Sequence, residues 1–155
     1  MTRTRRGDYR LRIPEAERRI LRALPGQLRS ILDSEDPALE RLFPPAYPDD
    51  PELDRDFRAM VEPELRYGRL ASLEMMEATL DADRLDEEQL TAWLAALNDM
   101  RIVLGTRLGV TEEMYEEGIP EDHPEAPRFA IYAYLGWLVE QIVSALEESG
   151  TAGSR

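Results

Sequence analysis

A single segment of the chain, LDEEQLTAWLAALNDMRIVLGTRLG at residues 85–109, carries the clearest helical pattern in the sequence. Its large apolar residues recur at steps of three and four, which places side chains on one core-facing stripe of a helix. They are Leu90, Trp93, Leu94, Leu97, Leu104 and Leu108. Asp86 can cap the first turn, and Gly109 can adopt the left-handed conformation that ends a helix. The pattern therefore predicts a core helix over 86–109.

Two further helical patterns precede this segment. Over 14–32 one apolar stripe continues through Pro25, which predicts either one kinked helix or two stacked pieces, because proline disrupts a helix interior. The second pattern, over 53–80, is interrupted at Pro63, where a first part stops or kinks and a second can begin. Between them lies a proline-rich loop at 44–51. Three apolar residues in or beside the loop are interpreted as anchors onto the core: Phe43, Tyr47 and Leu53.

Two helical segments follow the core helix. A short acidic segment covers 111–117, and after a second proline-containing loop the last helix covers 127–148. Residues 149–155 are small and polar, which predicts a flexible tail. At 155 residues the chain fits one domain. We therefore expect a single all-α domain over 1–148, with about five main helices and a small β-hairpin at 1–13.

The hairpin is predicted from alternation at the N-terminus. Tyr9, Leu11 and Ile13 alternate with arginines, which is the period of a strand with one buried face. Gly7 stands where the turn is expected. An isolated hairpin is marginally stable in water, so one face has to pack on the helices or on a second copy of the chain.

Charge is distributed unevenly along the chain. The formal net charge is −13, yet residues 1–30 sum to +6 and the remaining residues to −19. A body this acidic repels a phosphate backbone at long range, so direct nucleic-acid binding is not expected of it. The basic N-terminus can fold against that acidic body, or it can contact a polyanion or a partner. The residues concerned are Arg3, Arg5, Arg6, Arg10 and Arg12.

The residue types present exclude several kinds of chemistry. The chain has no Cys, and all 19 of its basic residues are Arg, so it offers no thiol nucleophile and no lysine for Schiff-base chemistry. His123 is the only histidine and is interpreted as a loop residue, with a mononuclear metal site as the alternative. No phosphate-binding Gly-rich loop occurs. We therefore predict no catalytic, cofactor-binding or metal-ligating residue and no enzymatic activity.

The sequence predicts a cytoplasmic protein without a membrane segment. No apolar run is recognised that reaches the roughly 18 residues of a membrane span. The N-terminal segment MTRTRRGDYR is basic and lacks the apolar stretch of a signal peptide.

Candidate partner-binding residues lie on the core helix and on the last helix. Asn98, Asp99 and Arg101 interrupt the apolar pattern, and either form a recognition surface or a hydrogen-bonded network between helices. Tyr134 and Trp137 widen the apolar face of the last helix, which fits either a partner-binding surface or a helix buried nearly all round. A homodimer through that helix satisfies both interpretations.

Four motifs together resemble an actinobacterial family of domains of unknown function that includes the oxidative-stress transcriptional regulator AosR. They lie at 86–93, 97–101, 104–109 and 132–142, and the N-terminal hairpin and proline-rich loop are also similar, so the resemblance covers nearly the whole chain. The motifs are structural in character and carry no catalytic group.

The resemblance implies a non-enzymatic transcriptional regulator that works with a sigma factor or RNA polymerase. The family's characterised type is understood to sense oxidation through a cysteine pair, and no cysteine exists here to carry that switch. Asn98, Asp99 and Arg101 are shared motif positions. Two alternatives stay open: an adaptor unrelated to transcription, and nucleic-acid binding through the N-terminal arginines.

Overall fold

Helix α4 (Glu87–Leu108) forms the centre of the molecule and confirms the core helix predicted from the sequence. A capping box fixes its start: the Asp86 carboxylate accepts a hydrogen bond from the Gln89 backbone N–H at 2.8 Å, and the Gln89 side chain accepts one from the Asp86 N–H at 3.0 Å. Gly109 ends the helix with a φ of 62°, in the left-handed region. Local sequence signals therefore set both ends.

The structure is a computed structural model that describes residues 1–152, and the side chains of all of these except 115, 116 and 152. In this part of the chain the predicted all-α domain with a small N-terminal sheet is confirmed. Six helices and three short strands occur in the order β1 (Thr2–Arg3), β2 (Tyr9–Arg10), α1 (Glu15–Leu32), α2 (Leu39–Leu42), α3 (Pro51–Ala78), β3 (Arg84–Leu85), α4, α5 (Glu112–Glu117) and α6 (Ala126–Ala152).

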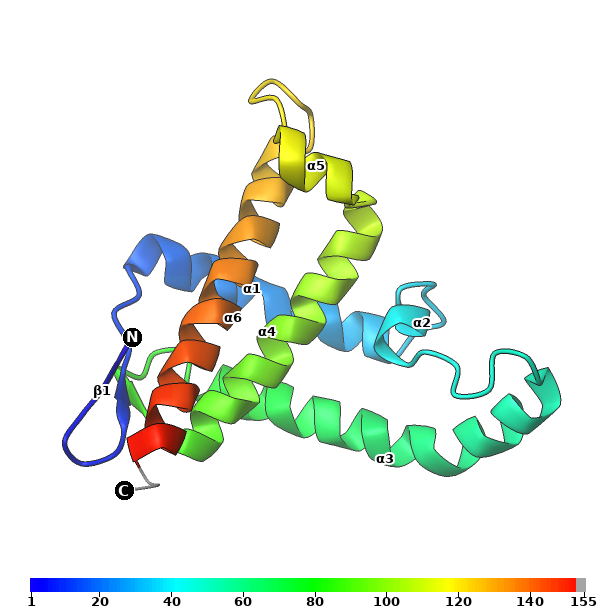
Figure 1. Cartoon of the computed structure of the whole chain (residues 1–155), viewed down its shortest axis with the longest axis horizontal. Helices are drawn as coiled ribbons and strands as arrows, with labels where there is room; N and C mark the ends of the chain where they lie inside the picture. The colour runs from blue at the N-terminus through cyan, green and yellow to red at the C-terminus, as the bar shows by residue number, and fades with distance from the viewer. Residues whose placement is uncertain (153–155) are drawn as a thin grey trace.

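The long helices are arranged around α4. Figure 1 shows α6 running beside α4, with α5 at one end of this pair and the N-terminal hairpin at the other. Helices α1 and α3 pack on α4 as well, and the N-terminal half of α3 extends away from the body (Figure 1). The core therefore lies between α4 and its neighbours.

Both internal prolines are accommodated inside continuous helices. Helix α1 runs through Pro25, whose ring is buried, and α3 runs for 28 residues through Pro63. The sequence left open whether each pattern was one helix or two, and the structure shows one in each case.

The N-terminal hairpin pairs with a third strand, β3, that was not predicted from the sequence. The sheet order is β1-β2-β3, all antiparallel, with Tyr9 opposite Leu85. Tyr9, Leu11 and Leu85 are buried, and the Leu11 N–H donates to the Asp83 carbonyl at 2.8 Å. The hairpin therefore packs on its own chain, which meets the need for a covering surface.

Two buried polar contacts join α3 to its neighbours in the core. Trp93 is 1% exposed, and its indole N–H donates to the Thr79 hydroxyl at 2.8 Å. The guanidinium of Arg18, which is also buried, donates to the carbonyl of Leu80 at 2.5 Å and to that of Ala82 at 3.2 Å. The two Arg18 bonds satisfy carbonyls just beyond the end of α3.

Two expectations about chain segments are corrected. Of the three proposed anchors only Phe43 is buried, whereas Tyr47 and Leu53 are exposed, because the start of α3 has no helix packed against its outer side. Helix α6 continues to Ala152, four residues past its expected end, so only 153–155 of the expected tail are left, and they lie outside the described residues.

Candidate partner-binding surfaces

Asp99 is held inside the protein by Arg69 of α3. Its side chain is 4% exposed and forms an ion pair with the Arg69 guanidinium. The same guanidinium donates to the Leu42 carbonyl at 2.7 Å and lies 4.9 Å from the centre of the Phe43 ring. Burial raises the pKa of Asp99, and the Arg69 contact opposes that shift only in part. Asp99 thus links α4 to α3 and α2.

Arg101 faces a different neighbour from Asp99. Its guanidinium lies against Gly136 of α6, where an added Cβ would stand 3.6 Å from Nη1. Arg101 also lines a cavity of about 280 Å³, together with Arg41 and Tyr132. Asn98 is partly exposed. The structure therefore does not bring the three motif residues onto one surface, since Asp99 points to α3 and Arg101 to α6.

Tyr134 and Trp137 form a stacked pair on α6. Their ring centroids are 6.0 Å apart with an interplanar angle of 24°, and Trp137 is 52% exposed. The Tyr134 hydroxyl donates to the Glu17 carboxylate at 2.7 Å, which ties this ring to α1. Burial, with the added effect of Glu17, raises the pKa of Tyr134. The neighbouring Leu135 and Leu138 are buried, so Trp137 is an outward-facing aromatic on a packed helix.

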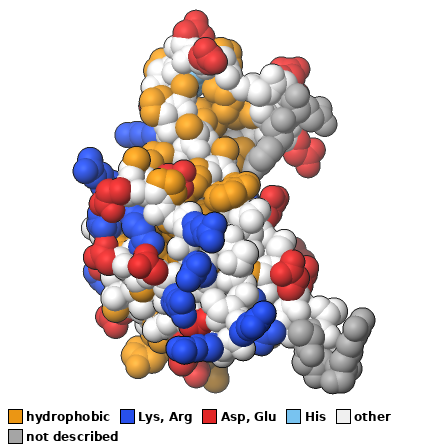
Figure 2. Space-filling view, turned by 90° about the vertical axis from the view of Figure 1, so that its left-hand side faces the viewer, with side chains coloured by type: hydrophobic (Ala, Val, Ile, Leu, Met, Phe, Trp, Pro, Cys, Tyr) orange, Lys and Arg blue, Asp and Glu red, His pale blue; other side chains and the backbone are white. Residues whose placement is uncertain are grey.

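The five hairpin arginines all point outward. Within residues 1–152, none of them takes part in an ion pair, although Arg84 of the same sheet contacts Asp8 at 3.8 Å. Figure 2 views the molecule from the side of the hairpin and shows basic side chains gathered over its lower half, with acidic ones between them. The backbone of the hairpin packs on the body, while its charges stay available: Arg3, Arg5, Arg6, Arg10 and Arg12.

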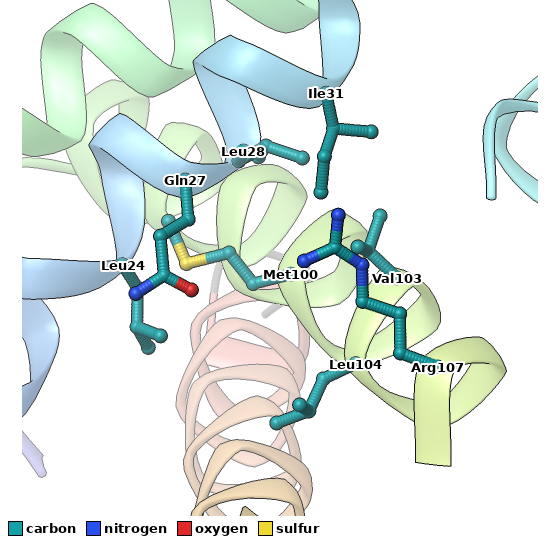
Figure 3. A pocket seen from close by; sticks show the side chains of 8 residues that line it. All are labelled: Leu24, Gln27, Leu28, Ile31, Met100, Val103, Leu104 and Arg107. Carbon is teal, nitrogen blue, oxygen red and sulfur yellow. The ribbon is translucent and has the colours of Figure 1, made fainter. Parts of the chain in front are cut away.

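A small apolar crevice separates α1 from α4. Leu24, Leu28 and Met100 line it, and Arg107 reaches over one end (Figure 3). Its volume is about 40 Å³, which suits one or two small groups rather than a cofactor. Arg107 donates to the Asp36 carboxylate at 3.0 Å, so its charge already has a partner within the chain.

The outer face of α3 is an exposed surface, of which only Leu53 was interpreted from the sequence as an anchor onto the core. Eight residues at alternating steps of four and three are all exposed, and Met60 and Tyr67 reach 80% and 75%. The buried residues of α3 are Leu73 and Met76 only. The spacing itself was visible in the sequence, but it does not say whether a face meets the core or a partner. This α3 seam consists of Leu53, Phe57, Met60, Glu64, Tyr67, Ala71, Glu74 and Ala78.

His123 has a local structural role. Its Nδ1 accepts a hydrogen bond from the Glu125 backbone N–H at 3.0 Å, and its ring meets the edge of Phe129 at a centroid distance of 5.6 Å. Among the residues described, no group of three or more His, Asp or Glu side chains is placed to hold a metal ion.

Helix α6 corrects the expectation that no segment is long and apolar enough to span a membrane. An 18-residue window within Ala126–Thr151 has a mean hydropathy of 1.4, which meets the length and composition of a membrane span. Core helices of soluble proteins can have the same length and composition. The helix is apolar on more than one side, because Leu135 and Ile142 pack inward while Trp137 and Val143 face outward.

The relatives found by comparison with known proteins are named as oxidative stress regulators. The chain is 34% identical over 130 residues to the oxidative stress regulator AosR of Mycobacterium tuberculosis (strain ATCC 25618 / H37Rv) and of Mycobacterium bovis (strain ATCC BAA-935 / AF2122/97). A relative from Mycobacterium leprae (strain TN) is 33% identical over 129 residues. These alignments cover 72% of this chain and 58–59% of the relatives, so the chain spans less than two thirds of their length.

No solved structure matches the chain. A family model described as a domain of unknown function, DUF2017, matches residues 1–146, which is nearly the whole chain. The relatives that the chain matches are named as oxidative stress regulators, and the match to the family model shows that this protein belongs to the DUF2017 family.

Proposed function

We propose that this protein is a non-enzymatic regulator of the oxidative stress response that acts by protein–protein contact with a sigma factor or RNA polymerase. The observation that carries the proposal is the outward-facing Trp137, stacked on Tyr134, in a chain whose relatives are named as regulators. The described residues offer small crevices and surface hollows, and the proposal therefore rests on surfaces rather than on a reaction.

The Tyr134–Trp137 pair has the properties of an anchor for a protein partner. Tryptophan and tyrosine are enriched among the few residues that dominate interface energies. The stacking contact and the hydrogen bond from Tyr134 to Glu17 hold the pair in one arrangement before binding. A preorganised anchor loses little conformational entropy when it docks, which favours affinity.

Charge supports a partner with both signs on its surface. The basic hairpin touches the C-terminal part of the domain, because β1 contacts α6, and the rest of the chain is strongly acidic. Complementary charges mainly raise the association rate and select the partner. Because this chain has no cysteine, we place any thiol-based sensing of oxidants in the partner.

A direct binding assay tests the proposal. The purified full chain is immobilised, and each purified sigma factor of the same organism, and core RNA polymerase, is passed over it under reducing and oxidising conditions. We expect one of them to bind, and Trp137→Ala to weaken that binding about tenfold or more. Val143→Ala is the control, because Val143 is an exposed apolar residue elsewhere on the same helix. Absence of binding by every component would contradict the transcription proposal and favour an adaptor with another role.

Nucleic-acid binding through the hairpin is the second candidate. The five outward-facing arginines without an ion pair in residues 1–152 favour it. Binding to labelled duplex DNA that falls steeply with salt, and that is lost when Arg3, Arg5 and Arg6 are changed to Gln, would support this candidate. No binding at low salt would remove it.

A further inference from the structure

The α3 seam has the spacing of a helix that packs along another helix. Its eight residues follow alternating steps of four and three from Leu53 to Ala78, an average repeat of 3.5 residues. That repeat keeps one side of a helix facing a partner helix over many turns, as in a coiled coil. In this structure no helix of the described chain covers the seam, and all eight side chains are exposed.

The apolar part of the seam is larger than solitary surface residues explain. Met60 and Tyr67 are seven residues apart, with Glu64 between them on the seam, and they are 80% and 75% exposed. Leu53 and Phe57 continue the stripe toward the N-terminal end, where Tyr47 meets the Phe57 ring edge-on at 5.5 Å. Contiguous exposed apolar surface of this kind marks an interaction site in soluble proteins.

The charge on the seam is acidic. Glu64 and Glu74 occupy positions of the repeat, and Asp56 borders it, with 100° of rotation per residue placing all three on the seam side of α3. The arginines of α3 lie on its other sides. Three of them are engaged there: Arg58 with Asp54, Arg66 with Glu62, and Arg69 with Asp99.

We propose that the α3 seam docks an amphipathic helix of a partner protein whose apolar stripe is flanked by basic residues. Apolar side chains of the partner would cover Met60 and Tyr67, and its basic side chains would pair with Glu64 and Glu74. A second copy of this chain is disfavoured, because it would bring the same carboxylates into one apolar interface. The seam is separate from the Tyr134–Trp137 pair, so this proposal does not rest on the proposed function.

Two synthetic peptides test the proposal on the full chain. Both are 28 residues long, the length of α3, and share one leucine heptad pattern; one has Arg and Lys at the flanking positions and the other has Glu. We expect the basic peptide to bind about tenfold or more tightly than the acidic one in fluorescence anisotropy. Equal binding of the two peptides, or no binding of either, would overturn the proposal.

A matched pair of variants separates seam binding from general attraction to an acidic protein. Met60→Glu and Ala59→Glu add the same charge at neighbouring exposed positions, but only Met60 lies on the seam. We expect Met60→Glu to weaken the basic peptide about tenfold and Ala59→Glu to leave its affinity within about twofold. If both variants strengthen binding, the attraction is non-specific and the proposal fails. Circular dichroism checks that both variants keep their helix content.

Charge reversal and cross-linking complete the test. The double variant Glu64→Lys with Glu74→Lys should shift the preference toward the acidic peptide. The chain has no native cysteine, so Tyr67→Cys gives a single thiol on the seam. Rapid disulfide-linked dimerisation of this variant, with a dimer of the natural chain that Met60→Glu dissociates, would overturn the proposal and assign the seam to a second copy.

Discussion

Arg69 and Asp99, thirty positions apart in the chain, form an ion pair in which the carboxylate is almost fully buried. The pair connects α3 to α4, and the additional bond from Arg69 to the Leu42 carbonyl includes α2. Removing one member of a buried pair leaves the other as an uncompensated charge, which is far more costly than the net value of the pair.

Arg69→Met is therefore expected to destabilise the protein by about 3 kcal/mol or more. The change keeps much of the aliphatic volume but leaves Asp99 without its cation. Urea unfolding followed by circular dichroism measures the effect. Arg55→Met is the control, because Arg55 is exposed on the same helix and makes no ion pair among the described residues. Similar unfolding midpoints for the two variants would contradict the structural role given to the pair.

The pH dependence of stability should carry the signature of Asp99. Burial raises the pKa of Asp99 in the folded state above its ordinary value of 3.8. At a pH between the ordinary and the raised pKa, the folded state therefore holds a proton that the unfolded state has lost. The stability of the natural chain relative to Asp99→Asn should therefore be greatest below this window and fall as pH rises through it. Urea unfolding of both proteins across the acidic range measures this difference, with Asp56→Asn as an exposed control. A difference that grows with pH would contradict the prediction.

The two tryptophans should respond differently to truncation. Trp93 is buried and bonded to Thr79, so Trp93→Ala is expected to cost about 3–5 kcal/mol. Trp137 is half exposed, and Trp137→Ala should cost about 1 kcal/mol or less. Thermal and urea unfolding of both variants measure the contrast. A near-neutral Trp93→Ala would place that side chain outside the core.

The sequence predicted features that depend on neighbouring residues and failed where distant contacts decide. The boundaries of α4 follow from Asp86, Gln89 and Gly109, which act locally. Periodicity predicted a helical pattern over 53–80, which includes Met60, but an apolar stripe has the same spacing whether it faces the core or solvent. Strand β3 was missed because two residues carry no strand pattern.

The candidate partner-binding residues were likewise predictable only where neighbouring residues decide their position. The exposure of Arg10 and Arg12 follows from their alternation with Tyr9 and Leu11, which are buried. The interior position of Asp99 could not be foreseen, since its partner Arg69 stands thirty residues away and nothing local marks the pair. The motifs that carry the family resemblance include several core residues of α4, such as Leu97 and Met100.

The contact between α4 and α6 provides the last prediction, through two glycines that face opposite helices. A Cβ at Gly105 would lie 2.9 Å from Cε2 of the Tyr132 ring, a distance that forces the ring or the helices to shift. A Cβ at Gly136 would meet only the Arg101 side chain, at 3.6 Å, which is ordinary van der Waals contact. In a helix interior alanine is more favourable than glycine by about 1 kcal/mol. Both substitutions gain this helix propensity, so their stabilities should differ only through packing.

Gly136→Ala should therefore leave stability unchanged or raise it by up to about 1 kcal/mol, whereas Gly105→Ala should be less stable than Gly136→Ala by about 1–3 kcal/mol. Urea unfolding of the two variants measures the difference, and Gly105→Ala combined with Tyr132→Leu should recover part of the loss, because the smaller side chain makes room for the methyl group. Equal stability of the two single variants would mean that α4 and α6 approach each other less closely at Gly105 than the structure shows.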